Sequence, residues 1–159
     1  MWREARIRAA KYNDALNSQD GVADILGFGR DAIRRIENNL NKVMPVDTAV
    51  LLADLYKEPS LLNYYCLKEC PIGRKKPLSD ENVDIERATV KLTKALRKEP
   101  IQWIKHGLQD IAADGVISDD EFEKLEVIVE ELREIARVIS ELEIIRDKRR
   151  VDESVSGSK

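Results

Sequence analysis

Residues that bind transition metals or cradle phosphates are scarce in this chain of 159 residues. It contains one histidine and two cysteines. A site with two histidines therefore cannot form within one chain, and a four-ligand zinc site would need a carboxylate or a second chain. No GxGxxG or GxxxxGK(S/T) phosphate loop is present. We predict a protein that is not an enzyme and that holds neither a metal nor another cofactor.

Long apolar runs and helix-breaking residues are also few. No apolar run approaches the roughly 18 residues of a membrane span, and the first residues lack the apolar core of a signal peptide. We therefore expect a cytoplasmic protein with no membrane segment, whose two cysteines need not form a disulfide. Only seven glycines and five prolines interrupt a chain in which 43% of residues are apolar and 36% charged. This composition predicts an ordered, all-α fold.

Charge is distributed unevenly along the chain. Residues 1–76 hold 13 basic and 10 acidic side chains, a net charge of +3, whereas residues 77–159 hold 14 and 20, a net charge of -6. The change coincides with the segment CPIGRKKP, whose proline, glycine and basic residues favour a linker. We place a domain boundary after Lys76. The first half could meet a polyanion that the second half would repel, although +3 also suits an ordinary surface.

Five short helices are predicted in residues 1–76, at 2–15, 19–26, 30–37, 46–56 and 59–68. Ser18 is a favourable N-cap for the second helix, and Gly27 is a favourable residue at its end. The three residues between the second and third helices include glycine, which is typical of a helix-turn-helix. Helix 30–37 directs Ile33 and Ile36 inward and three arginines outward. Such a face can contact phosphates and guanine edges, or can simply be solvated.

The stretch SQDGVADILG from Ser18, followed by RDAIRRIEN from Arg30, resembles the Xre family of phage-repressor-like regulators. The Ser-Gln pair, the central alanine, the Leu-Gly turn and the Ile-Glu-Asn ending carry the resemblance. The later LLADLY from Leu51 is similar to the family's fourth helix, and the resemblance covers about residues 2–68. It implies a five-helix, repressor-like helix-turn-helix domain in residues 1–76, which reads double-stranded DNA with helix 30–37 in the major groove.

The resemblance also implies two kinds of DNA contact. Base edges would face Arg30 and Asp31 at the start of helix 30–37, and Arg34 and Arg35, one helical turn further on, could touch bases or phosphates. Phosphates would face the start of helix 19–26, where Gln19 would also brace the recognition helix, and the loop after residue 37. Arg6 and Glu37 occupy positions that often form an internal ion pair. The residues implied to bind DNA are Gln19, Arg30, Asp31, Arg34, Arg35, Asn38 and Lys42.

Residues 77–150 are predicted to form a helical dimerisation module, with helices at 82–98, 100–113 and 119–148. The last helix carries six apolar residues at alternating spacings of three and four, which is a heptad seam. The seam fits an internal three-helix core, a partner chain, or both at once. We expect a homodimer, and a disordered tail at 151–159. The seam residues are Leu125, Ile128, Leu132, Ile135, Ile139 and Leu142.

Two further segments have competing interpretations. In a calcium loop at 110–121, Asp110 and Glu121 would hold the first and last positions, but Ala112 stands where an oxygen ligand is expected. A capping box formed by residues 118–121 explains the segment without a metal, and we favour it. Cys66 and Cys70 share one helix face. We favour buried structural thiols there over a redox switch or a metal site between chains.

The sequence therefore supports two functions of different classes. The favoured one is a sequence-specific DNA-binding transcriptional regulator that acts as a dimer. The alternative is a non-enzymatic interaction or scaffold protein whose helix-turn-helix no longer binds DNA. Gly29, which has no capping side chain, and Asp31, which repels phosphate, favour the alternative, as does the acidic second half.

Overall fold

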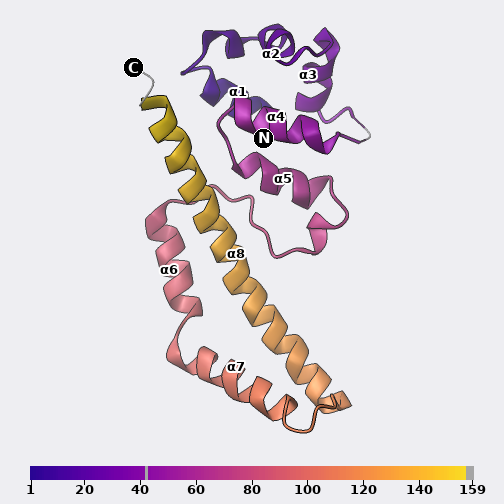
Figure 1. The fold of residues 1–159 in the computed structure, drawn as a ribbon, viewed down its shortest axis with the longest axis vertical. Helices are drawn as coiled ribbons and strands as arrows, with labels where there is room; N and C mark the ends of the chain where they lie inside the picture. The colour runs from indigo at the N-terminus through magenta and orange to yellow at the C-terminus, as the bar shows by residue number, and fades with distance from the viewer. Residues whose placement is uncertain (42, 157–159) are drawn as a thin grey trace. The chain divides into compact units, whose positions relative to one another are not determined.

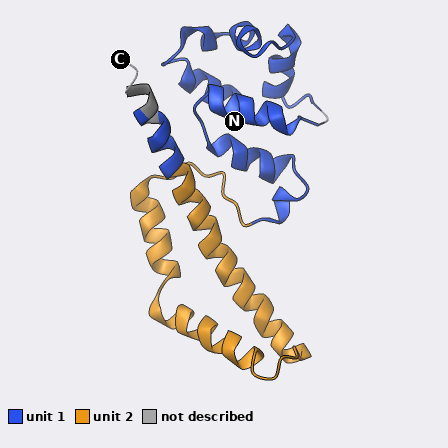
Figure 2. Cartoon of the chain, viewed as in Figure 1, with its two compact units in different colours: residues 1–76, 146–159 blue, residues 77–145 orange. Residues whose placement is uncertain are grey.

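The computed structural model describes residues 1–41 and 43–156, and these residues form helices joined by turns and loops, without a β-strand (Figure 1). The all-α fold class is thereby confirmed. The chain divides into two compact units (Figure 2). Unit 1 comprises residues 1–76 and the chain from Arg146 onward, and unit 2 comprises residues 77–145. Within the described residues, no helix is long and apolar enough to cross a bilayer.

Unit 1 contains five α-helices before the boundary. A single apolar core joins them, in which Leu16, Val22, Ile33, Leu52 and Leu61 are almost fully buried. Such enclosed aliphatic side chains are the main source of a small domain's stability. The helices are α1 (Trp2–Ala9), α2 (Gln19–Leu26), α3 (Arg30–Glu37), α4 (Val46–Leu55) and α5 (Ser60–Lys68).

The first helix is shorter than predicted. α1 ends at Ala9, and a 3-10 turn, η1 (Asp14–Asn17), follows instead of a helix running to residue 15. The reason is local, because the Asn13 side chain accepts a hydrogen bond from the backbone N–H of Ala15 at 3.1 Å and starts the new turn. Asparagine side chains compete with helical hydrogen bonds in this way. The turn still buries Leu16 in the core.

Unit 2 is built from α6 (Ile85–Ala95), α7 (Lys98–Ile111) and the part of α8 (Asp119–Ser156) that ends at Ile145. α6 starts later than predicted because Asp84 caps it, its carboxylate accepting from the backbone N–H of Arg87 at 2.7 Å. Figure 1 shows α7 beside the first turns of α8, and α6 beside the later turns of α8. α7 approaches closely at Gly107, where a Cβ would lie 2.7 Å from the Ile128 side chain.

α8 extends further than predicted. It continues to Ser156, so residues 151–156 are helical rather than part of a disordered tail, and residues 157–159 lie outside the described part of the chain. No glycine or proline interrupts the sequence between residue 119 and Gly157. An ion pair between Arg149 and Glu153 at 3.0 Å, one helical turn apart, supports the extension. The residues from Arg146 onward group with unit 1, which corrects the predicted boundary of the C-terminal module at residue 150.

The heptad seam of α8 is only partly used inside unit 2. Ile128 is fully buried against Ile104 and Ile111 of α7. Leu132 and Ile139 are 41% and 47% exposed, and Val129 and Phe122 are exposed beside them. An internal three-helix core therefore accounts for one part of the seam and leaves the other part uncovered.

Candidate nucleic-acid interface

α2 and α3 are joined by three residues and have the bounds that the sequence predicts. The Ser18 hydroxyl accepts from the backbone N–H of Gly21 at 2.9 Å and caps α2. Gly27 ends α2 with a φ of +67°, a left-handed conformation that glycine adopts without strain. Glycine is also required at position 21, where a Cβ would lie 2.0 Å from the carbonyl oxygen of Ala15. Ser18 and Gly21 therefore fix the position of the turn before α2, and Gly27 fixes the direction in which the chain leaves α2 toward α3.

α3 has one buried face and one exposed basic face. Ile33 and Ile36 are buried in the core of unit 1, as predicted. Successive residues of an α-helix are rotated by about 100°. The two isoleucines therefore lie opposite the centre of the exposed face. That face carries Arg30, Asp31, Arg34 and Arg35.

The exposed side chains of α3 differ in how far they are engaged. Arg34 pairs with Asp31 at 2.9 Å, but the side chains are 59% and 77% exposed, and such a pair is worth little free energy. Arg35 donates from Nε to the side-chain oxygen of Asn41 at 3.2 Å. No described residue makes a hydrogen bond or ion pair with the guanidinium of Arg30. Arg30 can therefore bind a ligand without breaking an internal contact, whereas Arg34 and Arg35 cannot.

A buried hydrogen-bond network supports α3 from beneath. The Glu37 side chain is 1% exposed, and its carboxylate accepts from Arg6 Nε at 2.5 Å and from Arg6 Nη2 at 3.3 Å. This confirms the predicted internal ion pair. Gln19 Nε2 donates to the same carboxylate at 2.6 Å. Arg6 Nη1 also donates to the carbonyl oxygens of Leu16 and Asn17, each at 2.9 Å. The network links α1, the start of α2 and the end of α3.

The other members of the predicted DNA-binding set have mixed placements. Asn38 is exposed at the C-terminus of α3, where its amide donates to the carbonyl oxygen of Arg34 at 2.9 Å. Asn39 follows with a φ of 52°, which turns the chain toward the loop before α4. Lys42, in that loop, lies outside the described residues. Five of the seven predicted residues therefore lie at the start of α2 or along α3, and Asn38 follows directly after α3.

A second buried carboxylate in unit 1 was not predicted. Glu58 accepts from Ser60 Oγ at 2.7 Å and pairs with Arg8 at 2.9 Å and with Lys148 of α8 at 2.7 Å. Burial alone would raise the pKa of the Glu58 carboxyl, but the hydrogen bonds from Lys148, Ser60 and Arg8 outweigh burial and hold this pKa below its ordinary value. The site joins α1, the start of α5 and the end of α8. Its partners are far apart in the sequence, so no local pattern could reveal it.

The charge difference between the units exceeds that between the halves of the sequence. Residues 1–76 together with 146–159 hold 18 basic and 13 acidic side chains, a net charge of +5. Residues 77–145 hold 9 and 17, a net charge of -8, and the two values sum to the total of -3. The basic C-terminal end of α8 groups with unit 1, which increases the contrast. A polyanion is thus attracted to unit 1 and repelled by unit 2.

The two weaker candidate sites have the geometry of structural elements. Ser118 donates from its backbone N–H and from Oγ to the Glu121 carboxylate, at 2.8 Å and 2.7 Å, which confirms the capping box at the start of α8. Cys66 and Cys70 are half-buried free thiols. Burial, and then the neighbouring Cys70, raises the pKa of the Cys66 thiol, which lowers its reactivity.

No family model, curated protein or solved structure matches this chain. The resemblance to the Xre family is therefore a prediction that depends on the residues and spacings of α2, α3 and α4 alone.

Proposed function

We propose that the protein is a cytoplasmic, non-enzymatic regulator that binds double-stranded DNA in a sequence-specific manner, with α3 in the major groove. The observation that carries the proposal is the exposed arginine face of α3 above the buried network of Arg6, Gln19 and Glu37. A helix that reads base edges must present its side chains in a fixed geometry. A buried carboxylate held from two other helices supplies such support at the end of α3.

The charges of the two units support a polyanionic ligand on unit 1. Association with DNA depends on the neutralisation of phosphates by lysine and arginine and on the release of counterions. Unit 1 has a net charge of +5, and Arg30 has its charge free of internal pairing among the described residues. Arg30 is therefore assigned to a base edge, where a guanidinium can make two hydrogen bonds to guanine.

A homodimer is proposed through the exposed part of the α8 seam. Phe122 and Val129 are seven residues apart, as are Leu132 and Ile139, and all four are exposed on α8. A heptad repeat of this kind packs against a partner helix. A two-fold axis between two copies would pair these faces and would present two α3 helices to two half-sites. We call these four residues the α8 apolar face.

The test is selection from a random duplex pool with the full chain at about 50–100 mM salt, followed by fluorescence anisotropy on the enriched duplex. Arg30→Ala is expected to weaken binding by about 1–3 kcal/mol and to relax base preference at one position. Arg3→Ala is the matched control, because it removes one exposed positive charge from α1 of the same unit. A pool with no enriched sequence, or equal losses in both variants, would refute the proposal.

The Asp31–Arg34 ion pair favours a second candidate. It places a carboxylate on the face that would meet phosphates, and Gly29 leaves α3 without a capping side chain. A helix-turn-helix that has lost DNA binding and acts as a protein-interaction module would have these features. That candidate predicts no duplex enrichment, together with an intact dimer through the α8 apolar face.

A further inference from the structure

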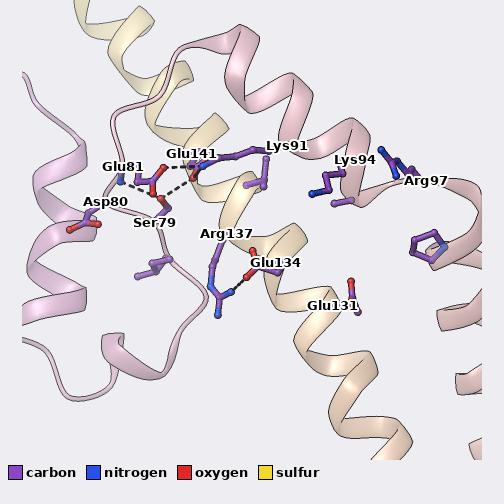
Figure 3. Close-up of a pocket in the computed structure, with 14 residues that line it drawn as sticks. Ser79, Asp80, Glu81, Lys91, Lys94, Arg97, Glu131, Glu134, Arg137 and Glu141 are labelled. Atoms are coloured by element: carbon purple, nitrogen blue, oxygen red, sulfur yellow. Dashed lines mark hydrogen bonds and ion pairs between the residues drawn. The ribbon is translucent and has the colours of Figure 1, made fainter.

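Unit 2 contains a cavity of about 710 Å³ between residues 78–81, α6 and α8 (Figure 3). Sites for small molecules have volumes of about 300–1,000 Å³. The cavity has apolar patches at Leu78, Ala95, Pro100 and Val138, and charged side chains of both signs surround them. A cavity with this lining favours a ligand that carries both charges on a partly apolar body.

A buried carboxylate with an unused oxygen lies at one side of the cavity. Glu141 is 4% exposed, and its Oε1 accepts from Ser79 Oγ at 3.0 Å and from Lys91 Nζ at 2.7 Å. Its other oxygen, Oε2, is buried and accepts no hydrogen bond from any described residue. A buried acceptor left without a donor costs free energy. A ligand with an N–H donor at this position would remove that cost.

The neighbouring lysine is already neutralised. Lys91 Nζ bridges Glu141 and Glu81, at 2.7 Å and 3.0 Å. The hydrogen bond to Glu141 outweighs burial and raises the pKa of the Lys91 ammonium. Lys91 is therefore fixed to two carboxylates and does not turn toward Oε2. The donor that Oε2 lacks does not come from Lys91, and a ligand in the cavity can supply it.

Two cations at the other side of the cavity have no partner among the described residues. Figure 3 shows Lys94 and Arg97 there, away from Ser79 and Glu141. Their side chains make no hydrogen bond or ion pair with the residues that the structure describes. Arg137, by contrast, pairs with Glu134 and with Glu130. The charges of the lining without a partner among the described residues thus include a buried acceptor at one side and two cations at the other, together with the carboxylates of Asp80 and Glu131.

We propose that this cavity binds a small zwitterion of dipeptide or tripeptide length. Its ammonium group donates to Glu141 Oε2, and its carboxylate pairs with Lys94 and Arg97. A cavity of about 710 Å³ is large enough for a ligand of this size. A polyamine or an inorganic anion satisfies one side only. The inference goes beyond the proposed DNA binding and does not depend on it.

The test is isothermal titration calorimetry of the full chain with the dipeptide Ala-Leu and the tripeptide Leu-Ala-Leu. The same peptides with an acetylated N-terminus, with an amidated C-terminus and with both ends blocked are the matched probes. Saturable binding of a free peptide is expected, weakened at least about tenfold by either blocking group. If the doubly blocked peptide binds as tightly as the free one, the site holds an internal segment of a protein partner and the proposal is wrong. Absence of binding at about 10 mM also refutes it.

Three variants assign the two sides of the cavity. The double variant Lys94→Ala with Arg97→Ala should weaken the binding of the free peptide about tenfold. It should leave the binding of the amidated peptide unchanged, because that peptide has no carboxylate to pair with these cations. Lys98→Ala removes an exposed cation next to Arg97 that does not line the cavity, and should bind like the parent. Glu141→Gln should weaken the free peptide and leave the acetylated one unchanged. If the double variant Lys94→Ala with Arg97→Ala binds the free peptide as tightly as the parent, the assignment of these two cations to the peptide carboxylate is wrong. This outcome is decisive whether or not the Glu141 variant folds.

Discussion

Replacing Arg6 by methionine removes the cation from a carboxylate that is almost fully enclosed. The Glu37 side chain is 1% exposed and the Arg6 side chain 7%. Without Arg6, Glu37 keeps only the hydrogen bond from Gln19, and the carbonyl oxygens of Leu16 and Asn17 lose their shared donor. Removal of one partner from a buried ion pair costs about 3–5 kcal/mol. We expect Arg6→Met to destabilise unit 1 by that amount, a large share of the roughly 5–15 kcal/mol of a typical domain.

The loss can be measured by urea unfolding followed through tryptophan fluorescence. The chain has two tryptophans, of which Trp2 is buried in unit 1 and Trp103 is 42% exposed in unit 2. In a Trp103→Phe background, the signal from Trp2 reports on unit 1 alone. Arg34→Met is the matched control, because it removes an arginine from the exposed pair with Asp31. That variant should change the free energy of unfolding by about 0–1 kcal/mol.

A loss below about 1 kcal/mol for Arg6→Met would place the pair among ordinary surface ion pairs and would refute the reasoning. The double variant Arg6→Met with Glu37→Leu gives a second criterion. It removes the stranded charge together with its partner, so it should recover part of the loss. A double variant that is less stable than Arg6→Met alone would show that the arginine acts mainly through the two carbonyl oxygens.

Three other predictions concern assembly, calcium and acid stability. The double variant Leu132→Asp with Ile139→Asp should be a monomer in light scattering, with unchanged helicity. Val127→Asp changes an exposed residue that lies off the α8 apolar face, and this control variant should remain dimeric. A parent protein that is itself monomeric would refute the proposed dimer. Millimolar calcium should leave the melting temperature unchanged because the Glu121 carboxylate is occupied by the capping box, and a rise that Glu121→Gln abolishes would contradict this. The pKa of Glu58 is lowered in the folded state, so its stabilisation is present above the ordinary carboxyl pKa and is lost as pH falls through the folded value. Between roughly pH 5 and 3, the parent should therefore lose more free energy of unfolding than Glu58→Gln, and parallel losses would contradict the assignment.

The sequence predicts those parts of the fold that depend on neighbours in the chain. Ser18 and Gly27 set the ends of α2 through a cap and a left-handed turn, and both signals are local. The α1 boundary was wrong because Asn13 competes for the backbone, an effect that the apolar pattern of residues 2–15 does not show. The predicted end of α8 is wrong because residues 151–156 are expected to fray as a terminal segment, although no helix breaker precedes Gly157.

The candidate sites divide in the same way. The Arg6–Glu37 pair was predicted from family spacing, and the exposed face of α3 from helical periodicity. The carboxylates of Glu58 and Glu141 were missed, because each pairs with a lysine on a helix distant in the sequence. Single charged residues on amphipathic helices look like solvated positions until the tertiary structure brings their partners together.

Unit 1 consists of two chain segments, and this has a consequence for synthesis. Lys148, which pairs with Glu58, is translated after all of unit 2. Domains generally fold as they leave the ribosome, N-terminal parts first. Here the helices that would meet DNA emerge before unit 2, and the part of α8 that completes unit 1 emerges after it. A nascent chain that has not yet reached Lys148 would thus hold the buried Glu58 carboxylate without one of its two cations, although the Arg6–Glu37 support of α3 has already been made.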